Sequence, residues 1–213
     1  MSDFKKRFIS VLDYAETNLF LIGLLGLLGF PLYFYIWSYW FPQPYENLGL
    51  RLSCAMLFVP WLFYKVFFYR YKNLFSIYFF LSSLISMPFF FSFMLIKNEF
   101  SVVWAMSYIA SLCLLVIIIH DWLLVSSMIV LGFSMAYALT WFSDGIIHLS
   151  YFQPEYVPIW LFVLVGSIVA NHRHKLAELR AKIKLIRGLA GSIAHEMRNP
   201  LAQIHGNLYL IEE

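Results

Sequence analysis

Long apolar stretches alternate with short polar turns along most of this chain. Six of them carry few charges, and a membrane-spanning helix needs about 20 such residues. They occupy residues 19–41, 48–69, 74–96, 100–119, 122–143 and 156–170. Arg51 and Lys65 lie near the ends of the second stretch, where long basic side chains can snorkel to the lipid headgroups. The pattern therefore predicts an all-α membrane protein with six transmembrane helices.

Composition agrees with this prediction. Of the 213 residues, 62% are hydrophobic, 20% are aromatic and only 13% are charged. A soluble domain does not have this balance, so we expect most of the chain to lie in lipid. The net charge of +3 is too small to indicate a nucleic-acid partner. Cys54 and Cys113 lie within apolar stretches, where we expect neither a disulfide nor a metal site.

The distribution of basic residues predicts the orientation in the membrane. The first apolar stretch is too long for a signal peptide and no small-residue cleavage site follows it, so we expect it to stay as an anchor. Lysines and arginines gather near the N-terminus, in the second loop and after the sixth stretch, whereas the opposite side has little beyond Lys97 and Arg51. By the positive-inside rule, both termini are cytoplasmic. The predicted parts are a cytoplasmic N-terminal segment (1–18), a membrane domain (19–170) and a cytoplasmic segment (171–213).

Two smaller patterns within the membrane domain predict local contacts. Gly23, Gly26 and Gly29 fall on one side of the first stretch, where small residues let a neighbouring helix approach closely. His120 and Asp121 form a minimal turn between two stretches. We interpret them as a hydrogen-bonded pair that caps a cytoplasmic turn, and a proton or metal site is the alternative.

After the sixth stretch the apolar residues recur at steps of three and four, the spacing of a helix that pairs with a second helix along a seam. The seam positions are Leu176, Leu179, Ile183, Ile186, Ala190, Ile193 and Met197. The spacing therefore predicts a cytoplasmic, coiled-coil-like helix within a homodimer. The pattern slips after Met197, and Pro200 should bend the helix there.

The segment from Ser192 to Leu201 carries candidate chemistry. At about 100° per residue, His195 lies roughly 165° from the seam, so its imidazole points away from the packed face. Glu196 can hold one ring nitrogen as N–H, which leaves the other nitrogen free to attack phosphorus. Asn199 lies one turn further on the same side, where it can orient water. We interpret His195 as a phosphoacceptor, and an ordinary amphipathic helix with an exposed histidine is the alternative.

The run His-Glu-Met-Arg-Asn-Pro-Leu resembles the H-box of sensor histidine kinases. The resemblance implies ATP-dependent phosphorylation of His195 in the dimer, with Glu196 as the candidate base. It also implies that ATP with Mg is bound by a further domain. That domain and the second dimerisation helix are not among these 213 residues, so we expect a chain truncated before the ATP-binding domain and inactive alone.

The outward loops favour a lipophilic signal. Residues 41–47, 97–99 and 144–155 are too few to fold into a domain that captures a soluble ligand. The sequence from Ala170 to His195 is about 25 residues, or roughly 37 Å as a helix. Because no relay domain fits there, we expect the sixth span to feed the phosphoacceptor helix directly.

Motifs along the whole chain resemble the CqsS/LqsS family of quorum-sensing histidine kinases of vibrios and legionellae. They include residues 14–16, 29–31, 40–43, 45–51, 88–91, 104–107 and 120–121. The resemblance implies that a long-chain α-hydroxyketone autoinducer binds among the membrane helices and suppresses net kinase activity. It also implies phosphotransfer to a response regulator or phosphotransfer protein, and a location in the bacterial inner membrane.

The same resemblance implies a ligand pocket between the fourth and sixth spans. Trp104 and Ser107 match the family pattern and lie one helical turn apart, so an aromatic wall and a hydroxyl share one face. Phe162 also matches, whereas Trp160 and Ala170 replace the Phe and Cys of the vibrio protein. For each of these residues, helix packing is the alternative role.

A protein of another class remains as the alternative reading of the whole chain. It is a six-span transporter, or a ligand-binding membrane protein, whose cytoplasmic helix only resembles an H-box. Transporters usually carry ionisable residues in mid-membrane and internal repeats. The spans here have few of the former and no evident repeat, which favours the sensor.

Overall fold

In the computed structural model, the described residues are 3–144, 161–163, 165–166, 168–169, 176–177, 179–193 and 196–197. Regular structure within them is entirely helical, with no strand, which confirms the all-α prediction for this part of the chain. Residues 1–171 and 172–213 form two separate compact units. The helices in order are α1 (Asp3–Ala15), α2 (Leu19–Tyr35), η1 (Ile36–Trp40), α3 (Leu48–Met56), α4 (Val59–Leu62), η2 (Tyr64–Phe68), η3 (Tyr69–Tyr71), α5 (Lys72–Leu84), η4 (Ile85–Phe89), α6 (Phe90–Lys97), α7 (Val102–Ile118) and α8 (Trp122–Asp144).

Three helical stretches of the described chain are long and apolar enough to cross a membrane: Leu19–Trp40, Tyr64–Lys97 and Trp122–Ser143. Two apolar helices, Leu48–Leu62 and Val102–Ile118, are shorter. A membrane domain is therefore well supported. The count of six spans stays a prediction, because most of the sixth stretch lies outside the described residues.

The second predicted span is not one continuous helix, which corrects the sequence prediction. The α-helix ends at Met56, and after a turn at residues 57–58 a short α4 begins. Pro60 lies in the first turn of α4. A proline there cannot donate to the carbonyl of Met56, so the helix breaks and restarts, and the ring is tolerated at the new N-terminus.

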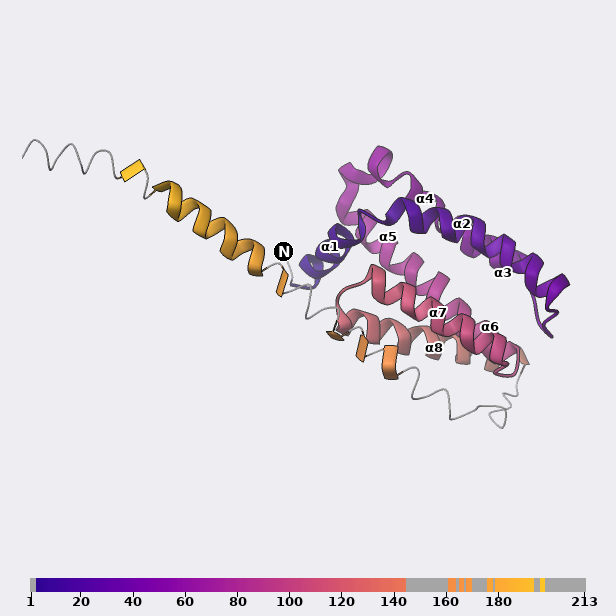
Figure 1. The fold of residues 1–213 in the computed structure, drawn as a ribbon. Helices are drawn as coiled ribbons and strands as arrows, with labels where there is room; N and C mark the ends of the chain where they lie inside the picture. The colour runs from indigo at the N-terminus through magenta and orange to yellow at the C-terminus, as the bar shows by residue number, and fades with distance from the viewer. Residues whose placement is uncertain are drawn as a thin grey trace, which may run out of the picture. The chain divides into compact units, whose positions relative to one another are not determined.

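Helices of the membrane domain pack closely where glycine allows it. In the bundle, α2 lies against α3 and α4, and α8 lies against α6 and η4 (Figure 1). A Cβ atom on Gly26 would lie 2.5 Å from the ring of Phe58, and one on Gly132 would lie 2.8 Å from the backbone nitrogen of Phe89. The predicted close approach is confirmed for Gly23 and Gly26, whereas Gly29 has nothing within 4 Å.

The N-terminal helix α1 packs on α5 and α7 (Figure 1). Its apolar face is buried, with Leu12 fully enclosed. On its polar face, Asp13 forms an ion pair with Lys72 at the start of α5. The amphipathic N-terminal segment is thus a docked helix that covers one end of the bundle.

The turn between α7 and α8 lies at the same end of the bundle. Asp121 Oδ1 accepts hydrogen bonds from the backbone nitrogens of Leu123 (3.0 Å) and Leu124 (3.4 Å). Arg7 lies 3.5 Å from the other carboxylate oxygen, and the His120 ring lies 4.8 Å from that of Tyr14. Asp121 therefore caps α8, which confirms the capping part of the prediction, whereas a hydrogen bond between His120 and Asp121 stays a prediction.

In the second unit, residues 179–193 form a helix, and 176–177 and 196–197 are also helical. The predicted seam residues are exposed along this helix in the single chain. Such a row of apolar side chains needs a partner surface, so the geometry is compatible with the predicted dimer seam. The seam itself stays a prediction.

Candidate functional site

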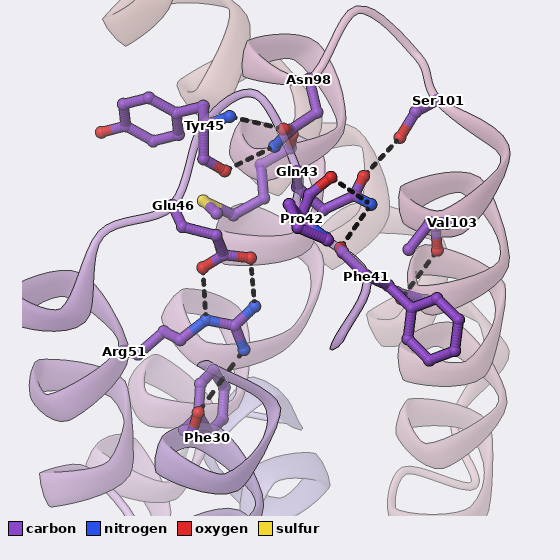
Figure 2. Close-up of polar contacts among 12 residues, drawn as sticks. Phe30, Phe41, Pro42, Gln43, Tyr45, Glu46, Arg51, Asn98, Ser101 and Val103 are labelled. Carbon is purple, nitrogen blue, oxygen red and sulfur yellow. Dashed lines mark hydrogen bonds and ion pairs between the residues drawn. The ribbon is translucent and has the colours of Figure 1, made fainter. Parts of the chain in front are cut away.

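A buried ion pair lies where the loop before α3 meets the helix. Asn47 caps α3 by accepting a hydrogen bond from the Leu50 nitrogen (3.0 Å), which places Arg51 in the first turn. Arg51 is only 2% exposed. Its Nε and Nη2 atoms each donate to one carboxylate oxygen of Glu46 at 2.8 Å (Figure 2). This bidentate geometry is the strongest form of the pairing.

The prediction that Arg51 snorkels to the headgroups is therefore wrong. The side chain points into the bundle instead. The carboxylate of Glu46, five residues earlier, satisfies two of its donors there and balances its charge. Lys65, at the other end of the same stretch, is exposed, and its contact with the headgroups stays a prediction.

Trp104 of α7 forms an aromatic wall beside Arg51. The guanidinium carbon lies 5.2 Å from the centroid of the Trp104 ring and 5.7 Å from that of Phe90, both within the range of a cation–π contact. Arg51 Nη1 also reaches the carbonyl oxygen of Phe30 at 3.5 Å. Trp104 is fully buried, yet its Nε1 has no hydrogen-bond partner among the residues that the structure describes.

A network of side-chain hydrogen bonds fixes the loop that carries Glu46. Asn98 Nδ2 donates to the backbone carbonyl oxygen of Tyr45 (3.1 Å), and Asn98 Oδ1 accepts from the backbone nitrogen of Tyr45 (2.9 Å) (Figure 2). The hydroxyl of Ser101 donates to Gln43 Oε1 at 3.3 Å. Residues 43–46 are therefore held against the α6–α7 turn, which positions the carboxylate of Glu46.

That turn contains backbone strain. Glu99 and Phe100 have φ angles of 53° and 56°, a left-handed conformation that residues other than glycine rarely adopt. Phe100 is also buried, so its side chain anchors the strained backbone. Strained turns of this kind persist where the surrounding contacts over-determine them.

Of the residues predicted to bind ligand, Trp104 and Ser107 share a face of α7, as expected. Ser107 Oγ donates to the carbonyl oxygen of Val103 at 2.8 Å, so its hydrogen is in use while its oxygen can still accept. Phe162 is helical but 81% exposed, so it does not share the buried environment of Trp104. Trp160 and Ala170 lie outside the described residues.

The predicted phosphoacceptor site is described only in part. Glu196 is helical and exposed. His195 and Asn199 lie outside the described residues, so their roles stay predictions. Within the described parts of the chain, no group of three or more His, Cys, Asp or Glu side chains lies close enough to hold a metal ion.

Sequence reasoning did not find Glu46 or Asn98 as parts of this site. A signal for Glu46 was present: an acid directly before the capping Asn47, followed by Arg51 in the first turn of the helix. Asn98 gave no such signal, because its partners are backbone atoms of Tyr45, far away in the sequence.

Comparison with known proteins shows similarity to a curated sensor kinase. The CAI-1 autoinducer sensor kinase/phosphatase CqsS of Vibrio cholerae serotype O1 is 35% identical to this chain over 201 residues, which are 94% of the chain and 29% of that protein. The chain thus spans less than a third of the length of this relative. No family model and no solved structure match the chain. The predicted resemblance to CqsS-type sensors is confirmed by this similarity.

Proposed function

Starting from this CqsS-type similarity, we propose that the chain is the sensor part of a membrane-embedded quorum-sensing histidine kinase. It binds a lipophilic α-hydroxyketone autoinducer among its helices. Binding controls the ATP-dependent phosphorylation of His195 and the transfer of the phosphoryl group to a response regulator or phosphotransfer protein. The observation that carries this proposal is the 35% identity to a sensor kinase/phosphatase along 94% of the chain.

The proposed reaction is the transfer of one phosphoryl group. A ring nitrogen of His195 attacks the γ-phosphorus of ATP, the bond to the bridging oxygen breaks and ADP leaves. Glu196 holds the other ring nitrogen as N–H, so the attacking nitrogen keeps its lone pair. An aspartate of the regulator then takes the group, and Asn199 orients water when the regulator is dephosphorylated. ATP and Mg are bound by a domain outside these residues.

The structure supports the ligand part of the proposal through Trp104 and Ser107. Both lie on α7, and Trp104 contacts Arg51 of the ion pair, so one helix face offers an aromatic wall and an acceptor oxygen. The apolar helices around them are compatible with a ligand that partitions into lipid. In this proposal the chain sits in the bacterial inner membrane with six spans, both termini are cytoplasmic and two copies pair through the seam.

The first prediction tests the phosphoacceptor. The chain, continued by the kinase portion of the Vibrio relative, should incorporate radiolabel from ATP in a form that is labile to acid and stable to alkali. His195→Ala should abolish the label, because it removes the imidazole nitrogen that attacks the γ-phosphorus of ATP. His205→Ala, on the same segment, is the matched control and should label normally. Persistent labelling of His195→Ala would rule out the assignment.

A further inference from the structure

We propose that Arg51 is itself a ligand-binding residue, which donates hydrogen bonds, together with the indole N–H of Trp104, to the carbonyl oxygen of an uncharged amphiphile. The inference rests on the proposed function, which already names a hydroxyketone, and adds Arg51 and the ligand group to which it binds. Glu46 acts as the positioning residue, since it fixes the guanidinium plane.

The buried donors in this cluster exceed the acceptors. A guanidinium carries five N–H donors. Three of those of Arg51 have acceptors: two on Glu46 and one on Phe30. Five minus three leaves two, and the Nε1–H of Trp104 also finds no acceptor among the described residues. Arg51 and Trp104 are 2% and 0% exposed, so these donors lie away from bulk solvent.

The charge balance selects a neutral acceptor. The carboxylate of Glu46 already neutralises Arg51, and both side chains are buried. An anionic ligand would therefore leave a net negative charge in a low-dielectric site, which is costly. A cationic ligand would bring no acceptor for the three donors. A carbonyl oxygen brings two lone pairs and no charge, so it satisfies the cluster without unbalancing it.

The surroundings select what is attached to the carbonyl. The rings of Phe90 and Phe91 lie 6.3 Å and 6.2 Å from that of Trp104, and Phe30 lies 5.0 Å from Phe90. These side chains offer only apolar surface to the carbon atoms beside the oxygen. The matching ligand class is a long-chain ketone with its oxygen at Arg51 and its hydrocarbon along the rings.

The experiment measures ketone binding directly. The full chain is reconstituted in lipid nanodiscs with isotope-labelled decyl hydroxymethyl ketone, and empty nanodiscs report partition into lipid. Binding is measured by equilibrium dialysis, and the carbonyl stretching band by isotope-edited infrared spectroscopy. We expect the band to move to lower frequency only with protein present, because hydrogen bonds weaken the carbonyl bond. Dodecane and dodecanoate, tested as competitors, should displace the ketone poorly.

The decisive variant replaces both members of the ion pair, Glu46→Leu with Arg51→Met, since losing one alone would strand a buried charge. We expect at least about tenfold weaker ketone binding and a smaller band shift, because the charged donors are lost while the N–H of Trp104 remains. The control is Asp13→Asn with Lys72→Met, which removes an ion pair at the opposite end and should change neither. Circular dichroism and gel filtration confirm that each variant folds.

Trp104→Phe provides a second test that leaves both members of the ion pair in place. It keeps an aromatic face beside Arg51 and removes the N–H together with the five-membered ring, so ketone binding should weaken by about fivefold. Trp141→Phe, on an exposed tryptophan of α8, should bind as the unmodified chain does.

The results separate this inference from the function on which it rests. Folded variants of the ion pair that keep both the affinity and the band shift overturn the role of Arg51, while ketone binding by the unmodified chain still upholds the proposed function. If the ion-pair variant does not fold, unchanged binding and band position in Trp104→Phe overturn the inference. Displacement by dodecanoate as strong as by the unlabelled ketone overturns the neutral ligand class. An unmodified chain that does not bind the ketone overturns both proposals.

Discussion

Ser107 illustrates how a single hydroxyl can select for one part of a ligand. Its hydrogen is donated to the carbonyl oxygen of Val103, so toward a ligand it can only accept. In the proposed binding mode it complements the hydroxyl of an α-hydroxyketone, whereas Arg51 and Trp104 complement the carbonyl oxygen.

This complementarity predicts a selective effect of Ser107→Ala. The kinase response to an α-hydroxyketone should need about fivefold more ligand, from the loss of one neutral hydrogen bond. The response to the ketone without the hydroxyl should not change. Dose–response curves of radiolabel incorporation measure both.

Ser126→Ala is the matched control, because Ser126 is also partly buried and makes the same bond to the carbonyl four residues earlier, but lies on α8. An equal loss of response to both ketones in Ser107→Ala would contradict the assignment and indicate a packing role.

At the residue scale, the sequence predicted which side chains share a face of one helix. It did not predict which side chains contact one another between helices. The shared face of Trp104 and Ser107 follows from helical spacing alone. The burial of Arg51 does not, because it depends on the Asn47 cap and on Asn98 holding the loop. Hydropathy places Arg51 at the membrane–water interface, because a hydropathy value for each residue does not show that a carboxylate lies nearby to neutralise the charge.

At the scale of elements, the contact of α8 with the π-helical segment η4 depends on Gly132. Gly132→Ala should lower the free energy of unfolding by about 1–3 kcal/mol, because the added methyl group meets the backbone at Pro88 and Phe89, which cannot move aside easily. Thermal unfolding in nanodiscs measures the change.

Gly29→Ala is the control for this prediction. It lies in α2 with nothing within 4 Å of the added Cβ, so the gain in helix propensity should leave stability unchanged or raise it by up to about 1 kcal/mol. Equal stability of the two variants would show that the contact at Gly132 relaxes without cost.

The helical character of the chain was predictable from long apolar stretches, while the internal geometry of the helices was not. Hydropathy is blind to the hydrogen-bond register, so the break at Pro60 and the π-helical turn around Pro88 do not appear in it. A proline in a sequence predicts that the helix is distorted there. Whether the distortion is a break or a π-helical turn depends on how the neighbouring helices pack.

At the scale of the whole molecule, the exposed apolar row of the second unit predicts dimer formation. Ile186→Asp should raise the dimer dissociation constant at least about tenfold, because an unpaired carboxylate would be buried in the seam. Sedimentation analysis of the purified protein measures the constant.

Leu185→Asp is the neighbouring control, since Leu185 is equally exposed but off the predicted seam. Equal weakening by both substitutions would place the dimer contact elsewhere.

The general architecture could be predicted from composition and from the change of periodicity after the membrane domain. The three long apolar helices and the all-helical described residues agree with that reading. The count of spans depends on the short stretch 156–170, whose length is marginal for lipid and which composition alone does not decide.

The ion pair of Glu46 and Arg51 has a consequence for how the protein enters the bilayer. Its two members are only five residues apart, so the carboxylate and guanidinium can meet within one local turn before any other helix arrives. The segment then leaves the translocon as an electrically neutral unit, and the expense of carrying a lone arginine into hydrocarbon does not arise. Neutralisation of Arg51 during insertion thus requires only Glu46, and Asn98 of the α6–α7 turn can hold the loop at a later stage.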